Sequence, residues 1–271
     1  MTDKTIIKDH FSDTAFVWRD KIYKHREHQG IFEYFDKQYR FDYVVSMIPP
    51  SKDDEPRALD VGCGAGQLLP VLADKGYNTY GIDVSSQMID CAHQVCKREN
   101  IKADLQLGDC ENLTYPDNFF DLYVAMGVIE YMDSDAPMLN EIKRVLRPGG
   151  IAIVTLRNVR SIHVRWRTLY VSLIETKLKN IIRSVIGKKT KPYRSISKEH
   201  DSDEFRGQVT SLSLKIIEER YAHFRTFPAP LDIWFKWLEA IPGKIMEKYC
   251  STGRFTFMAS TFIVKFQKAP E

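Results

Sequence analysis

Apolar residues recur along this chain in two patterns, which alternate through its middle part. Short apolar runs fit buried strands at Ala58–Val61, Ala103–Leu107, Phe120–Met126 and Ile151–Leu156, and a further strand ends at Asp83. Segments of helical character lie between these runs, the first of them at Gln67–Lys75. Strands that alternate with helices predict a parallel sheet, so the sequence indicates an α/β fold over Arg57–Leu156.

The flanking segments are predicted to be mainly helical. Residues 11–48 are rich in aromatic residues, and a polar linker bounded by prolines follows at 49–56. After residue 158, apolar residues from Trp166 to Val185 fall at three- and four-residue spacings, which predicts one face of an amphipathic helix. Another helix is predicted at Leu212–Arg220, and a closing strand at Phe255–Phe266. We therefore expect a helical cover at 1–50 and a main domain at 51–271, with an insertion at about 159–200.

A glycine-rich loop, Gly62–Gly66, follows the first strand directly and leads into a helix. Glycines let the backbone turn tightly and approach a ligand where a Cβ would collide. Asp83 ends the second strand 21 residues after Gly62, within reach of the two hydroxyls of a ribose. This unit predicts a binding site for a cofactor that contains adenosine.

The spacing of the glycines favours S-adenosylmethionine over NAD. A dinucleotide loop is spaced G-x-G-x-x-G, so that its helix receives a pyrophosphate, whereas this loop is G-x-G-x-G. S-adenosylmethionine has no phosphate, and the ammonium of its amino-acid end can pair with Asp60 or with a loop carbonyl. We therefore predict S-adenosylmethionine as the cofactor, held by Asp60, Gly62, Gly64, Gly66 and Asp83.

Three further motifs follow the loop in order. Asp109 lies in Gly108–Glu111, after the third strand, where it can accept a hydrogen bond from an adenine amino group. Gly127–Tyr131 follows the fourth strand, and Leu146–Gly150 precedes the fifth. With the glycine loop, this order resembles the class I S-adenosylmethionine-dependent methyltransferases, closest to their small-molecule branch, which includes the ubiquinone-pathway enzymes.

The resemblance implies a Rossmann-like, doubly wound sheet of seven strands, with Phe255–Phe266 as its antiparallel edge. It also places Arg40, which precedes the linker, on the carboxylate of the cofactor, a pairing that suits a bidentate guanidinium. The expected cofactor site further includes Met88, Cys110 and Met126.

The candidate catalytic residues are Glu130, Tyr131 and His200. In the metal-dependent ubiquinone-pathway enzymes, two acids and a histidine come from the loop that here carries Gly127, Glu130 and Tyr131. Two of the three implied ligands are missing, so we predict that no metal takes part. Tyr131 is expected to orient the acceptor, because a tyrosine with a pKa of ~10 is a poor base near neutral pH. His200 resembles a histidine found before the sixth strand in several relatives and is the predicted general base, although a solvated or helix-capping role is the alternative.

Composition and charge bear on the compartment and on the partners. Five cysteines without a C-x-x-C pair argue against a disulfide framework or a zinc site. No apolar run reaches the ~18–20 residues of a membrane span, and the N-terminus has no signal-peptide core, so we expect a cytoplasmic protein. The net charge is +3, yet residues 151–200 hold twelve Lys and Arg against two acids, a local charge of +10. This segment suggests peripheral contact with an anionic membrane or a cover over an acidic acceptor, while a helix packed on the sheet is the simpler interpretation. No nucleic-acid-binding module is recognised, and we expect no nucleic-acid partner.

The sequence therefore predicts an enzyme that moves a methyl group from S-adenosylmethionine to an oxygen or nitrogen nucleophile of a small or lipid-linked acceptor. Two alternatives stay open: methylation of a carbon in a quinone-type ring, and a cofactor-binding interaction protein without catalysis. The intact loop and both acids, Asp83 and Asp109, argue against the second alternative.

Overall fold

The computed structural model describes residues 4–17, 31–51, 54–170, 198–224, 245–246, 248–251 and 255–270. The strands are β1 Arg57–Val61, β2 Asn78–Asp83, β3 Ala103–Leu107, β4 Phe120–Ala125, β5 Leu146–Arg157, β6 Leu214–Phe224 and β7 Ala259–Lys268. The helices are α1 Lys4–Val17, α2 Ile31–Met47, α3 Leu69–Asp74, α4 Ser86–Glu99, α5 Ala136–Val145, α6 Ile162–Tyr170 and α8 Ser202–Ser211, with short 3-10 turns η2 Ile129–Tyr131 and η4 Thr256–Met258.

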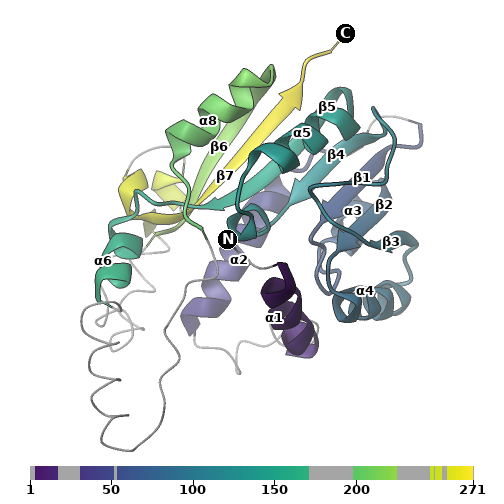
Figure 1. Cartoon of the computed structure of the whole chain (residues 1–271), viewed down its shortest axis with the longest axis horizontal. Helices are drawn as coiled ribbons and strands as arrows, with labels where there is room; N and C mark the ends of the chain where they lie inside the picture. The colour runs from purple at the N-terminus through teal and green to yellow at the C-terminus, as the bar shows by residue number, and fades with distance from the viewer. Residues whose placement is uncertain are drawn as a thin grey trace, which may run out of the picture.

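The strands form one seven-stranded sheet in the order β3-β2-β1-β4-β5-β7-β6 (Figure 1). β1 to β5 pair in parallel, which confirms the predicted parallel core, and β7 pairs antiparallel with both β5 and β6. The closing strand is antiparallel, as expected, but the expectation that it forms the edge is wrong. β7 lies between β5 and β6, and its residues Phe262, Ile263 and Val264 are fully buried in the two core clusters. β6 forms this edge of the sheet instead, and β3 forms the other.

The predicted helix at Leu212–Arg220 is also wrong. The helix in this part of the chain is α8, which ends before Ser213, a residue with a φ of 61° that breaks the helical path. β6 then begins at Leu214 and pairs with β7. Apolar residues at 212, 214, 216 and 217 fit both helical and alternating spacing, and the hydrogen bonds offered by β7 decide in favour of the strand.

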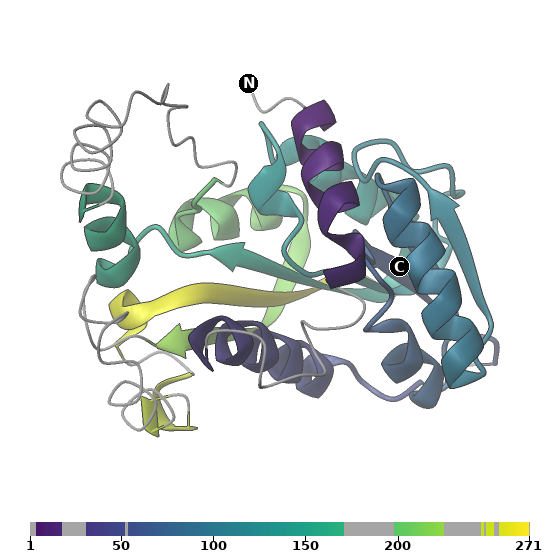
Figure 2. The ribbon, with the colours of Figure 1, turned by 90° about the horizontal axis from the view of Figure 1, so that it is seen from below.

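Two helical layers cover the sheet, since successive residues of a strand point to opposite faces. Leu59 in β1 and Tyr123 in β4 belong to the core cluster that α5 and α8 complete. Ala58 and Leu122, one residue earlier in each strand, belong to the cluster that α2 and α3 complete. Figure 2 shows α2 beneath the sheet and α8 above it. These layers confirm the doubly wound, Rossmann-like architecture.

The N-terminal helix begins earlier than the sequence pattern suggested, at Lys4 rather than at residue 11. Ile7, Phe11 and Ala15 are spaced by four residues and form its inner face, and Ala15 packs against Met88 in α4. α1 therefore lies beside α4 at the end of the sheet where the parallel strands finish (Figure 2). This position makes it one wall of the cavity described below.

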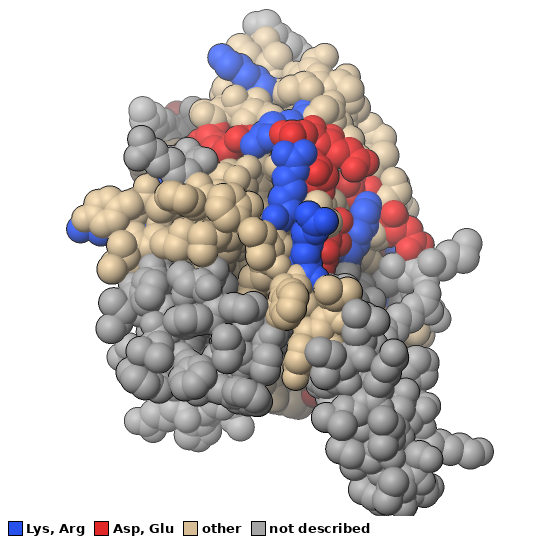
Figure 3. All heavy atoms as spheres, turned by 90° about the vertical axis from the view of Figure 1, so that its left-hand side faces the viewer, with Lys and Arg blue, Asp and Glu red and all other residues tan. Residues whose placement is uncertain are grey.

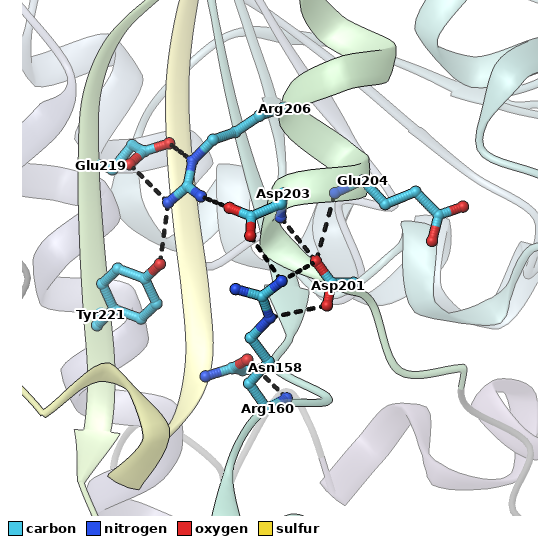
Figure 4. Close-up of polar contacts among 8 residues, drawn as sticks. All are labelled: Asn158, Arg160, Asp201, Asp203, Glu204, Arg206, Glu219 and Tyr221. Atoms are coloured by element: carbon cyan, nitrogen blue, oxygen red, sulfur yellow. Dashed lines mark hydrogen bonds and ion pairs between the residues drawn. The ribbon is translucent and has the colours of Figure 1, made fainter.

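The two ends of the insertion after β5 are joined by hydrogen bonds and an ion pair, which form its neck. Asn158 forms an isolated parallel bridge with His200, and the Arg160 guanidinium binds the Asp201 carboxylate through its Nε, at 2.8 Å, and its Nη2, at 3.0 Å (Figure 4). α6 confirms the start of the predicted amphipathic helix, whereas its continuation through residues 171–197 lies outside the described residues. Within the described ranges, no helix is long and apolar enough to cross a bilayer.

Candidate cofactor and acceptor site

A cavity of about 220 Å³ lies between α1 and the carboxyl ends of β1, β2, β3 and β4. Ligands of open parallel α/β sheets bind at this end of the strands. Most of the residues predicted for cofactor and acceptor line this cavity: Arg40, Asp60, Gly62, Gly64, Asp83, Met88, Asp109, Cys110, Met126, Glu130 and Tyr131. Segments that lie far apart in the sequence therefore meet in one place, as predicted from the order of the motifs.

The loop after β1 is shaped by close backbone approach. Gly62 has a φ of 63°, and a Cβ on it would lie 2.4 Å from Cγ2 of Val128. A side chain at this position would therefore collide with the loop after β4. Gly66 instead packs against Ala92 in α4 and does not line the cavity. Its role is in the packing of the loop on the helix, so the structure separates it from the other predicted cofactor residues.

Asp83 organises the loop from the end of β2. Its Oδ2 accepts a hydrogen bond from the Gly64 amide at 2.9 Å, and its Oδ1 accepts one from the Ser85 amide at 2.9 Å. Burial raises the pKa of this carboxyl, while these backbone hydrogen bonds act to lower it. The carboxylate is thus fixed in direction at the cavity wall, as binding of a ribose diol requires.

Asp60 is a buried acid beside the same wall. The residue is 3% exposed, and no described residue donates a hydrogen bond to its carboxyl. Burial, together with the nearby Asp83 carboxylate, raises the pKa of Asp60 well above its ordinary value. A cation placed in the cavity would offset both effects. The site therefore fits the ammonium of an amino-acid group, as the sequence predicted for S-adenosylmethionine.

Arg40 reaches the cavity from α2 through the space left by a glycine. Its Nη1 lies 3.0 Å from the position that a Cβ on Gly127 would occupy. The Gly127 amide in turn donates to Oγ1 of Thr155 in β5 at 2.8 Å, which fixes the loop after β4. A guanidinium held at the cavity in this way suits a carboxylate ligand.

Asp109 is held from two sides at the end of β3. Its Oδ1 accepts a hydrogen bond from the Glu111 amide at 3.0 Å, and its Oδ2 pairs with Nζ of Lys4 at 2.6 Å. Lys4 also pairs with the Glu111 carboxylate. Burial would raise the pKa of Asp109, but the hydrogen bond from Lys4 and the one from the Glu111 amide lower it overall. Thus α1 is fastened across the part of the cavity where an adenine amino group was predicted to bind.

Glu130 and Tyr131, in η2, form the opposite end of the cavity. Glu130 is 7% exposed, and Phe11 in α1 packs edge-on against Tyr131 with ring centroids 5.2 Å apart. Burial, the charge of Glu130 and a hydrogen bond to Glu130 raise the pKa of Tyr131 to about 12. Tyr131 therefore keeps its proton at neutral pH and donates a hydrogen bond to the Glu130 carboxylate.

The structure does not place His200 in the cavity. Its ring is buried, and Nε2 lies 3.0 Å from Oδ1 of Asp135, away from the lining residues. Conversely, Lys4, Ile7 and Phe11 line the cavity but were not predicted as site residues, because this segment was interpreted only as a helical cover. The four-residue spacing of Ile7, Phe11 and Ala15 carried the signal that would have placed them.

Comparison with known proteins supports the same interpretation. Residues 59–154 match the family described as "Methyltransferase domain". The 2-methyl-6-phytyl-1,4-hydroquinone methyltransferase of Synechocystis sp. is 32% identical over 132 residues, covering 45% of this chain and 40% of that protein. The ubiquinone biosynthesis O-methyltransferase of Rickettsia bellii is 33% identical over 122 residues, covering 44% and 50% respectively. The chain thus matches half or less of the length of these curated relatives.

The fold also has solved counterparts. The magnesium protoporphyrin IX methyltransferase of Synechocystis PCC 6803, solved with bound S-adenosylhomocysteine, has a TM-score of 0.63 at 16% identity. The match covers 98% of this chain and 100% of that one, and at this identity it bears on the fold alone. Together with the family match and the motifs in the cavity wall, it leads to one conclusion. Residues 59–154 of this chain match the methyltransferase-domain family, and the chain has the fold of this solved methyltransferase.

Proposed function

We propose that this protein transfers a methyl group from S-adenosylmethionine to an oxygen or nitrogen nucleophile on a small or lipid-linked acceptor. The observation that carries the proposal is the single cavity that holds both the predicted cofactor residues and the Glu130–Tyr131 end. In this proposal residues 51–271 form the catalytic domain, and residues 1–50 cover the site.

The cofactor end fits S-adenosylmethionine group by group. Asp83 faces the cavity for a ribose, Asp109 for an adenine amino group, Asp60 for an ammonium, and Arg40 for a carboxylate. Gly64, Met88, Cys110 and Met126 supply further parts of the wall. When bound, the cofactor supplies an activated methyl group, so the protein has mainly to align the acceptor with it.

The acceptor end combines an apolar wall with one buried acid. Phe11 packs against Tyr131, and Ile7, Met132 and Glu130 line the same cavity. We assign to Glu130 the role of accepting a hydrogen bond, and then the proton, from the hydroxyl or ammonium of the acceptor. Tyr131 orients this carboxylate by donating a hydrogen bond to it. An aromatic or lipid-linked ring suits the apolar wall, and the names of both curated relatives point to quinone-related acceptors.

The test of the cofactor assignment is calorimetry with S-adenosylhomocysteine. Asp83→Ala should weaken binding by roughly 1.5–3 kcal/mol, the range for charge-assisted hydrogen bonds. Asp90, an exposed acid in α4, provides the matched control, since Asp90→Ala should leave the affinity unchanged. Equal affinity in both variants, or tight binding of NAD instead, would overturn the assignment.

The test of the reaction is transfer of labelled methyl groups to a panel of phenols, hydroquinones and amines. Product analysis by mass spectrometry then separates attachment at oxygen, nitrogen and a ring carbon, and the last result would favour the quinone-ring alternative. A protein that binds S-adenosylhomocysteine, yet methylates no member of a broad panel, would support the non-catalytic alternative.

We also propose that the insertion brings the protein to an anionic membrane. In α6, Ile162, Trp166 and Leu169 are exposed by 57%, 44% and 49%, and their spacing puts them on one face. The segment 151–200 that contains them carries the local charge of +10. Exposed apolar groups next to cations favour an interface with acidic lipid. The neighbouring face at α8 has basic and acidic side chains side by side (Figure 3), so attraction would come from the insertion itself.

Co-sedimentation with vesicles tests this second proposal. Binding should require acidic lipid and should weaken as salt rises, because each Lys or Arg near the surface contributes about 1 kcal/mol, screened over ~8 Å. Two variants should both lose binding: Trp166→Ser, and the change of Lys177, Lys179, Arg183, Lys188 and Lys189 to Gln. Sedimentation of none of the three proteins would leave the insertion as scaffold or as a cover for a soluble acceptor.

A further inference from the structure

His200 is bound in a way that a proton-accepting base would not be. Its Nε2 lies 3.0 Å from Oδ1 of Asp135, and since a carboxylate only accepts hydrogen bonds, Nε2 must carry a proton. The lone pair that remains is on Nδ1, which is buried and has no hydrogen-bond partner. His200 is not among the residues that line the cavity. The nitrogen that could take a proton is therefore closed off from any acceptor there.

The Asp135 carboxylate bonds His200 instead of capping its own helix. It is the N-cap residue of α5, a position where an Asp side chain normally accepts hydrogen bonds from the first amides of the helix. Here it makes no such bond and instead pairs with His200 and, at 3.2 Å, with Nζ of Lys198. Burial would raise the pKa of Asp135, but these two partners lower it overall. The carboxylate is ionised and committed to the 198–200 segment.

This segment holds the acceptor end of the cavity through backbone bonds. The Lys198 amide donates to the Glu130 carbonyl at 2.5 Å, and the His200 amide donates to the Arg157 carbonyl at 2.8 Å. The segment thus joins η2 to the end of β5. Asp201, the next residue, is bound on the outer side by Arg160 (Figure 4). His200 is therefore the inward anchor, and Asp201 the outward anchor, of the strand-like piece that supports Glu130.

We propose that His200 and Asp135 are positioning residues that set the place of Glu130 at the acceptor end of the cavity, and that His200 transfers no proton. The inference rests on the proposed function, because it assigns the proton-accepting role to Glu130. It replaces the expectation from the sequence that His200 is the general base.

Two substitutions of one residue separate the roles. Glutamine can present an amide N–H where Nε2–H of His200 lies, but it cannot act as a base near neutral pH. His200→Gln should therefore retain nearly wild-type turnover and an unchanged pH profile. His200→Ala loses the anchor, so it should lower kcat, by up to about 10²-fold if Glu130 shifts by 1 Å, with unchanged S-adenosylhomocysteine affinity.

Hydrogen exchange supplies a readout that needs no acceptor. Amides of residues 129–133 should exchange faster in His200→Ala and in Asp135→Ala, and at the wild-type rate in His200→Gln. His223, a second buried histidine, bonds Ser260 outside the cavity and gives the control, with His223→Asn chosen because asparagine tolerates its φ of 60°. That variant should leave residues 129–133 unchanged.

Other results would overturn the positioning role of His200. A loss of turnover of ~10²–10⁴-fold in His200→Gln, with normal exchange at 129–133, would show that His200 is the base. Unchanged exchange in His200→Ala would show that it anchors nothing. Failure of S-adenosylhomocysteine to bind the wild-type protein would overturn the proposed function instead, while the exchange results would still report on the anchor.

Discussion

Gly127 is the residue that gives Arg40 its place at the cavity. Its φ is 72°, and a Cβ would lie 3.0 Å from Nη1 of Arg40. Gly127→Ala should lower the free energy of unfolding by about 1–2 kcal/mol, the cost of a left-handed alanine, and should also weaken S-adenosylhomocysteine binding, because the guanidinium must move. Denaturant titration and calorimetry measure the two effects.

Gly149 provides a control that separates the strain of a positive φ from the contact with Arg40. It has a φ of 80°, and a Cβ there would have no heavy atom within 4 Å. Gly149→Ala should lose similar stability but keep normal cofactor affinity. Equal affinities in the two alanine variants would show that Arg40 does not bind the cofactor.

Replacing Asp60 should raise the stability of the ligand-free protein and weaken its binding of the ligand. Burial raises its pKa in the folded protein above the ordinary value of 3.8, so the folded state holds a proton that the unfolded state has released. Its contribution to stability therefore falls as pH rises above that value. Asp60→Asn should make the ligand-free protein more stable than wild type at neutral pH, by a margin that shrinks on acidification.

The same substitution should weaken S-adenosylhomocysteine binding, by roughly 1.5–3 kcal/mol, because the ammonium loses an ionised partner. Urea titration at several pH values, with calorimetry at neutral pH, follows both changes. A variant that is less stable than wild type at neutral pH, or that binds as tightly, would contradict this role for Asp60.

Single residues were predictable where one local motif fixes both the residue and its direction. Asp83 ends a buried strand next to a glycine loop, so its place at the cavity followed from the sequence. Asp135 could not be found in this way, because nothing near it in the sequence shows that its carboxylate turns from its own helix to His200, 65 residues away. Partners brought together only by tertiary structure carry no local pattern.

At the level of elements, α1 is held across the cavity by the ion pairs of Lys4. Lys4 is largely exposed, so Lys4→Gln should change the free energy of unfolding by less than about 1 kcal/mol. Ligand exchange should respond more strongly, because Ile7 and Phe11 move with the helix. We expect faster association and faster dissociation of S-adenosylhomocysteine, measured by stopped flow.

Lys8 is an exposed lysine of the same helix, and Lys8→Gln is the matched control. Raised salt should accelerate exchange in the wild-type protein and have little effect in Lys4→Gln, since it screens the same pair. Identical rate constants in wild type and Lys4→Gln would mean that the ligand enters without movement of α1.

A strand was predictable from the sequence where both of its faces are buried. β1 and β4 are covered on both faces and appear in the sequence as short apolar runs. β6 lies at one edge of the sheet, with a mixed burial pattern, and its residues were assigned to a helix because spacing alone does not reveal a neighbouring strand. β5 also begins earlier than predicted, at Leu146, where pairing with Phe120 extends it.

At the scale of the whole molecule, we predict methyl transfer without a divalent metal. Among the described residues, no group of three His, Cys, Asp or Glu side chains is arranged to hold a metal ion. In the resemblance, Gly127 and Tyr131 stand at two of the three ligand positions. Turnover should persist after treatment with EDTA, with a metal-dependent methyltransferase assayed alongside as the control. Loss of turnover that magnesium restores would contradict the prediction.

The general architecture was predictable from the sequence because its motifs follow the order of the parallel strands. The place of β7 was not, since its final position depends on two partners, β5 and β6, that precede it by different distances in the chain. The insertion was recognised by its charge and apolar spacing, but its neck, formed by Arg160 and Asp201, joins residues 41 apart.

The order of the strands also dictates how this protein can be made. β7 is synthesised after the other strands of this sheet, yet it lies between β5 and β6. While the ribosome is still translating residues 225–258, β6 has no strand to pair with and β5 presents an open edge. The nascent chain therefore passes through a stage at which an aggregation-prone edge is exposed, and a premature stop before residue 259 leaves it there. Quality control of such products would act on the β5 edge rather than on the cofactor loop.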